Sequence, residues 1–173
     1  MRNVAVRDAE TRVLSPVKVI GYSADVAVGT VDDFILLLWR RRVVPQGVGW
    51  AREAFAKLAG ERKHDRKLVF LTTVVPGCDI STPAEVRKDI AALLKTYESR
   101  IACAAIVFEN NGFGMTIVRS VITAIQMASR SRFPNAVFGS VESALGWMAT
   151  QDDAQVGVES SRIVEAIGRL RAL

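Results

Sequence analysis

Three strand-length apolar runs, separated by stretches with helical spacing, constrain the fold of this chain most. The runs are FILLLW at residues 34–39, LVFLTTVV at 68–75 and IACAAIVF at 101–108. A strand that is apolar on both faces is typical of the interior of a sheet that is covered by helices on each side. Because such strands alternate here with helical segments, the sequence predicts an α/β fold with a largely parallel sheet.

An antiparallel hairpin is expected to open this sheet. Residues 24–29 alternate well enough for a strand, and a short turn at Val31, Asp32 and Asp33 leads into the run at 34–39. A further short strand is predicted at 136–138, before the last part of the domain. We therefore expect a single mixed, mostly parallel sheet of about five strands with helices packed on it.

Capping signals predict where several helices begin. Thr82, followed by Pro83 and Glu85, reads as a capping box in which the Thr82 hydroxyl accepts from the backbone N–H three residues on. Ser140 is expected to cap a later helix in the same way. A helix is also expected to follow the run at 101–108 and to end at about Arg130.

The length of 173 residues fits one domain with a full core. We expect residues 1–18 to form a flexible or peripheral arm and 19–150 to form the α/β domain. Residues 151–173 read as an extra C-terminal amphipathic helix. That helix either packs on its own domain or contacts a partner.

Composition excludes several classes of protein. The chain is 50% hydrophobic and 24% charged, and no apolar run approaches the roughly 20 residues that span a bilayer. The N-terminal residues have no hydrophobic signal core, so we expect a cytoplasmic protein without a transmembrane segment. The net charge of +5 is dispersed, and no aromatic residues interleave with its densest group at residues 40–42. We therefore do not expect a nucleic-acid partner.

The residue types needed for common catalytic sites are scarce. His64 is the single histidine, and Cys78 and Cys103 lack the spacing of metal ligands. His64 lies in a charged loop, so a histidine-based triad and a multi-histidine metal site are nearly excluded. We expect no enzymatic activity, no metal and no cofactor.

The polar loop after residue 108 has two interpretations. Its glycines could let backbone N–H groups approach an anion or a partner at a helix N-terminus. Alternatively, they simply provide the turn between a strand and a helix, and no Gly-x-x-x-x-Gly-Lys pattern is present. The residues of this candidate ligand or partner loop are Glu109, Asn110, Asn111, Gly112, Gly114 and Arg119.

The layout resembles the STAS-like domains, named after sulfate transporters and anti-sigma-factor antagonists, and more narrowly the SpoIIAA-like bacterial proteins. Four segments carry the resemblance, which covers about residues 20–150. They are DVAVGTVDDFILLLWRR, LVFLTTVV, IVFENNGFGMTIVRSVITAI and NAVFGSVESALGWMA.

This resemblance implies signalling through protein–protein contacts or, in related lipid-binding versions, a ligand pocket. Regulatory members carry a phosphorylatable serine in an Asp-Ser-Ser-Gly-type turn before a central helix. The comparable junction here reads PGCDISTPAE, so Ser81 and Thr82 become the candidate phospho-switch although the glycine is absent.

These observations lead to two functional hypotheses. The first is a non-enzymatic regulatory or scaffolding domain that acts through protein partners in bacterial signalling, with a second copy of itself as one such partner. The alternative is a small binding protein for an apolar or lipid-like ligand between the sheet and the helices. Trp39, Trp50 and Trp147 could line such a pocket, although each also fits a core or edge position.

Overall fold

The computed structural model describes residues 17–61, 66–109, 132–151 and 160–173. These residues form one six-stranded sheet in the order β1-β2-β3-β4-β5-β6, with four described helices on its two faces. The strands are β1 (Lys18–Tyr22), β2 (Val26–Val31), β3 (Phe34–Trp39), β4 (Leu68–Val74), β5 (Ile101–Phe108) and β6 (Asn135–Phe138). The described helices are α1 (Pro45–Glu61), α2 (Ala84–Tyr97), α4 (Val141–Met148) and α5 (Ser160–Ala172).

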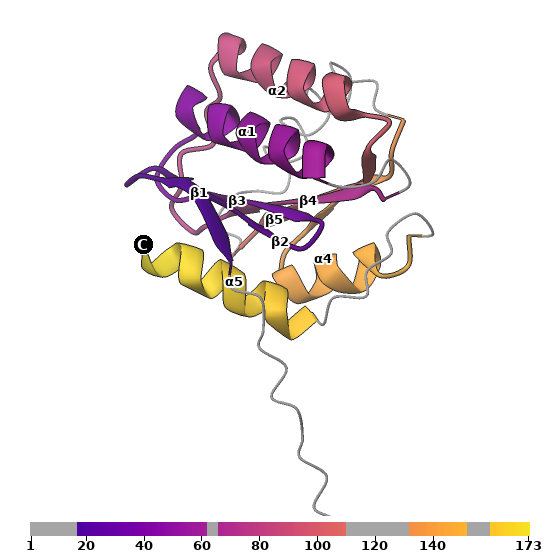
Figure 1. The fold of residues 1–173 in the computed structure, drawn as a ribbon. Helices are drawn as coiled ribbons and strands as arrows, with labels where there is room; N and C mark the ends of the chain where they lie inside the picture. The colour runs from indigo at the N-terminus through magenta and orange to yellow at the C-terminus, as the bar shows by residue number, and fades with distance from the viewer. Residues whose placement is uncertain (1–16, 62–65, 110–131, 152–159) are drawn as a thin grey trace, which may run out of the picture.

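The sheet is mixed, as predicted. β1, β2 and β3 are antiparallel neighbours, whereas β3, β4, β5 and β6 are all parallel. Figure 1 shows α1 and α2 on one side of the sheet and α4 and α5 on the other. This covering explains why the three apolar runs have no polar face, because both sides of β3 and β4 are buried.

The structure adds one strand to the five that the sequence predicts. β1 lies at the edge of the sheet, has a register shift between Val19 and Gly21, and leaves Val19 and Tyr22 exposed. An edge strand of this kind has no regular inside–outside alternation, so its sequence carries little periodic signal. The next strand begins at Val26 rather than at residue 24, because residues 23–25 form the turn between β1 and β2.

The turn between β2 and β3 is formed by Asp32 and Asp33, which confirms the predicted hairpin. Asp32 has φ of 50°, a left-handed conformation that aspartate tolerates better than most residues. Both turn carboxylates also form ion pairs with distant parts of the chain. Asp32 lies 3.1 Å from the Arg162 guanidinium in α5, and Asp33 lies 2.5 Å from the Arg66 guanidinium just before β4.

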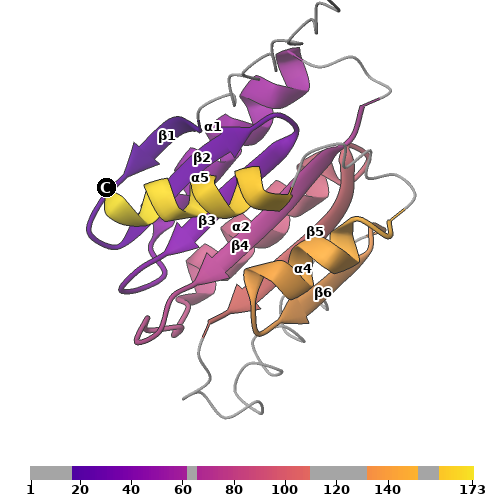
Figure 2. The ribbon, with the colours of Figure 1, turned by 90° about the horizontal axis from the view of Figure 1, so that it is seen from below.

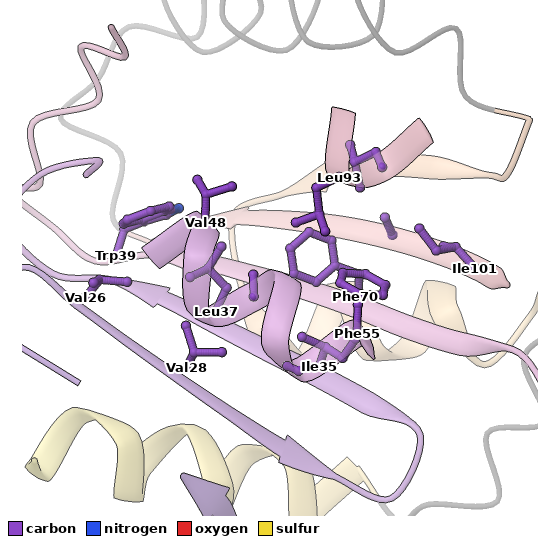
Figure 3. Packing of buried hydrophobic residues seen from close by; sticks show 14 of the residues in the cluster. Val26, Val28, Ile35, Leu37, Trp39, Val48, Phe55, Phe70, Leu93 and Ile101 are labelled. Carbon is purple, nitrogen blue, oxygen red and sulfur yellow. The ribbon is translucent and has the colours of Figure 1, made fainter. Parts of the chain in front are cut away.

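Two apolar cores lie on the two faces of the sheet. The core under α1 and α2 includes Phe55, which packs edge-on against Phe70 and stacks on Tyr97 at ring-centre distances of 5.2 and 5.0 Å. Figure 3 shows this core from close by, with Phe55 and Phe70 beside each other and with Trp39 near Val48. The core under α4 and α5 is built from the alternate residues of the same strands, such as Leu36 and Leu38 of β3.

The sequence predicts that the C-terminal helix either packs on its own domain or contacts a partner. In residues 160–173, α5 packs on its own domain. Ile163, Ala166, Ile167 and Leu170 are buried against the sheet. Figure 2 shows α5 crossing the sheet over β2 and β3, beside α4, which lies over β5 and β6. Gly29 of β2 makes this approach close, because a Cβ there would lie 3.1 Å from Leu170 Cδ2.

The two predicted helix caps have different outcomes. Ser140 caps α4 as expected, since its hydroxyl accepts from the Ser143 backbone N–H at 3.2 Å. The prediction for Thr82 is wrong: α2 begins at Ala84 after Pro83, and no side chain caps it. Thr82 therefore lies one residue too early to reach the first helical N–H groups, and its hydroxyl donates to the Ile80 carbonyl at 3.0 Å instead. The helix predicted to end at about Arg130 lies outside the described residues.

Candidate functional site

A cavity of about 110 Å³ lies between the α1 and α2 layer and the parallel part of the sheet. β3 contributes Leu37 and Trp39 to its lining, and α2 contributes Ile90, Leu93 and Leu94. Leu37, Trp39, Phe70 and Ala104 of this lining belong to the core under α1 and α2. The cavity thus lies against that core, and its described lining is almost wholly apolar.

A small side chain on β5 lies at the gap. In the parallel register, Ala104 lies beside Asn135 of β6, whereas the neighbouring strand β4 carries the large Phe70 at the position of Ala104. Protein interiors are normally packed without voids of this size, so large side chains on one strand and small ones on the next leave unfilled volume. Within residues 101–108, Ala104 is the small residue on this face, and the pairing of strands is needed to interpret it.

The lining contains no charged residue within the described part of the chain. Three of its members are polar, namely Thr72, Thr82 and Asn135. The Thr82 hydroxyl donates to the Ile80 carbonyl, and the Asn135 side-chain amide donates to the Phe133 carbonyl at 3.4 Å. The cavity therefore suits a neutral, mainly apolar molecule, because burying an unpaired charge there would be very unfavourable.

One of the three tryptophans considered from the sequence lines the cavity. Trp39 is 4% exposed and forms part of the wall at the end of β3. Trp50 packs at the margin of the same core, and Trp147 lies on the opposite face of the sheet, 5.5 Å from Phe138 between ring centres. The tryptophans therefore do not form a common pocket.

The arginines at residues 40–42 help to hold loops at the carboxyl end of β3. Arg40 donates to the Ser23 carbonyl at 3.2 Å and also to the Leu170 carbonyl in α5. Arg42 pairs with Asp25 at 3.3 Å. Two of these three positive charges thus have partners within the chain.

Ser81 lies on the surface beside Asp79. Its backbone N–H donates to Asp79 Oδ1 at 2.9 Å, and its hydroxyl also interacts with this carboxylate. These two hydrogen bonds from Ser81 hold the pKa of Asp79 below its ordinary value of 3.8. Phosphorylation of Ser81 stays a prediction, and it would place a second negative group beside Asp79.

The candidate loop after β5 is described only at its first residue. The Glu109 carboxylate accepts a hydrogen bond from Arg171 of α5, so it links the end of β5 to the C-terminal helix. Asn110, Asn111, Gly112, Gly114 and Arg119 lie outside the described residues. The choice between an anion or partner loop and a simple turn therefore stays open.

Among the described residues, no group of three or more histidine, cysteine or carboxylate side chains could hold a metal ion. Cys78 and Cys103 are both buried free thiols. In the same part of the chain, no helix has the length and apolar character required to cross a bilayer.

No protein-family model, curated protein or solved structure matches this chain. The cavity lining, which the sequence analysis did not identify residue by residue, is consequently the strongest guide to a function.

Proposed function

We propose that this protein is a non-enzymatic binding domain for a small apolar ligand, held in the cavity between α1, α2 and the parallel strands. The observation that carries this proposal is the 110 Å³ cavity, whose described lining residues are uncharged and almost wholly apolar. Apolar cavities of about 150 Å³ stay dry and bind molecules of the size of benzene. The volume here suits a ligand of that order or one end of a larger apolar chain.

Toluene is a suitable first probe, and the melting temperature is the readout. A ligand that binds only the folded state raises the melting temperature, and the stabilisation grows with the logarithm of its concentration divided by its dissociation constant. We expect saturating toluene to raise the melting temperature of the wild-type protein measurably. If neither toluene nor benzene changes it, the space is filled in solution by the chain itself, and the proposal fails.

A cavity-filling variant makes the test specific. Ala104 is 8% exposed and lines the cavity, so Ala104→Leu should fold with little loss of stability and should abolish the response to toluene. Ala54 is fully buried in the packed part of the same core and does not line the cavity. Ala54→Leu should therefore cost about 1–3 kcal/mol by overpacking and should keep the response to toluene.

A second candidate function is the regulatory domain that the STAS-like resemblance implies, acting through contacts with another copy. Within the described sheet, β1 pairs only with β2, and its Val19 and Tyr22 side chains are 42% and 55% exposed. An edge strand with exposed apolar side chains can add a strand from a partner. Light scattering should then show a dimer that Val19→Lys with Tyr22→Lys dissociates, and a monomeric wild-type protein would argue against this candidate.

A further inference from the structure

Thr72 belongs to the mainly apolar lining of the cavity, and no side-chain hydrogen bond joins its hydroxyl to another described residue. Thr72 is in the middle of β4, is 8% exposed, and lies beside Leu37 of β3 and Ile106 of β5, which also line the cavity. A hydroxyl group in the wall of a cavity, without a bond to the protein, can form a hydrogen bond to a molecule held there. The other two polar lining residues already donate to backbone carbonyls.

We infer that Thr72 is the specificity-determining residue of the cavity, and that the ligand is a neutral apolar molecule with one hydroxyl or carbonyl group bound to the Thr72 hydroxyl. This inference rests on the proposed function and adds the chemical class of the ligand. A threonine hydroxyl both donates and accepts, so it can bind either group. A carboxylate or ammonium group is disfavoured beside these residues, because the described lining has no charged residue to pair with it.

Phenol and toluene form a matched pair of probes, since they have nearly the same size and differ in one hydroxyl group. The quantity to measure is the ratio of their dissociation constants, obtained by calorimetry or by NMR titration. Thr72→Val removes the hydroxyl and keeps the shape of the side chain. We expect it to weaken phenol binding relative to toluene binding by about 2- to 10-fold, the usual effect of one hydrogen bond between neutral groups.

Thr73→Val is the matched control. Thr73 is the next residue of β4, is 2% exposed, and lies beside Leu38 and Val107, which belong to the core on the opposite face of the sheet. The same substitution there should leave the ratio for phenol and toluene unchanged. Thr72→Ser restores a hydroxyl and should keep the preference for phenol that Thr72→Val loses.

The outcomes distinguish the role of Thr72 from the proposed function. If both probes bind and Thr72→Val leaves their ratio unchanged, the role of Thr72 is wrong while the proposed function stands. If neither probe binds the wild-type protein, the proposed function falls and this inference falls with it. A measurement on the wild-type protein needs no variant: nuclear Overhauser contacts should join the Thr72 methyl group to the ortho protons of phenol, and contacts only to the para proton would overturn the inference.

Discussion

Gly47 is a residue at which α1 lies very close to β2 and β3. A Cβ at this position would lie 2.5 Å from Trp39 Cη2 and 2.8 Å from Val26 Cγ2. Both distances are shorter than a normal carbon contact, and both neighbours are buried, so neither side chain can move aside freely. The glycine is therefore required by packing, although glycine is a poor helix former.

We predict that Gly47→Ala destabilises the protein by about 1–3 kcal/mol, because overpacking exceeds the gain in helix propensity. Gly49 lies in the same helix, and a Cβ added there would have no atom within 4 Å, so Gly49→Ala is the control. It should be neutral or stabilising by up to about 1 kcal/mol. Urea unfolding of both variants measures the difference, and equal stability of the two would contradict the requirement for glycine at position 47.

Among the elements, α5 is held to the domain by both apolar and polar contacts. Leu170 is fully buried, and its backbone carbonyl accepts from Arg40 at the end of β3. Arg162 near the start of the helix pairs with Asp32, and Arg171 near its end pairs with Glu109. The surface ion pairs each contribute little, so most of the stabilisation must come from the buried apolar face.

Leu170→Ala should consequently cost about 2–5 kcal/mol, as is usual for large-to-small changes in a core. Val164 lies on the same helix and is 40% exposed, so Val164→Ala should change the free energy of unfolding by less than about 0.5 kcal/mol. Thermal and urea unfolding can compare the two variants. A small effect of Leu170→Ala would mean that α5 contributes little to the folded domain.

Across the molecule as a whole, each core contains one buried thiol. Burial raises the pKa of Cys103 from 9.0 to about 11, and burial together with the nearby Asp79 and Asp25 carboxylates raises the pKa of Cys78 to about 11. Between pH 9 and pH 11, the two thiols are largely deprotonated in the unfolded chain but still protonated in the native protein, so the unfolded chain binds fewer protons. The stability that the neutral thiols contribute is therefore complete below pH 9 and is lost as the pH rises towards 11.

We predict that the free energy of unfolding falls between pH 9 and pH 11, and that it falls less steeply in Cys78→Ala and in Cys103→Ala. Urea titrations at pH 8 and pH 10 provide the comparison, with each variant measured against its own value at pH 8. This design separates the pH effect from the small cavity that each substitution creates. Identical slopes in all three proteins would show that the thiols titrate normally.

The sequence predicts much of this fold because β3, β4 and β5 carry apolar residues on both faces, which is typical of interior strands. It fails at β1, where an edge position removes the alternation, and at Thr82, where the helix starts one residue later than the capping box requires. The cavity could not be predicted, because it depends on Ala104 lying beside Phe70, a pairing between residues distant in the sequence.

The position of α5 has a consequence for the synthesis of the protein. Leu170 of α5 packs against the layer formed by β2 and β3. Arg40, at the end of β3, precedes Leu170 by 130 residues, so these strands leave the ribosome long before the helix does. Until residues 160–173 emerge, Leu36 and Leu38 on that face of the nascent chain lack the helix that covers them. The growing polypeptide is thus a natural client for chaperones that bind exposed apolar strands, and a product terminated early would be retained by them.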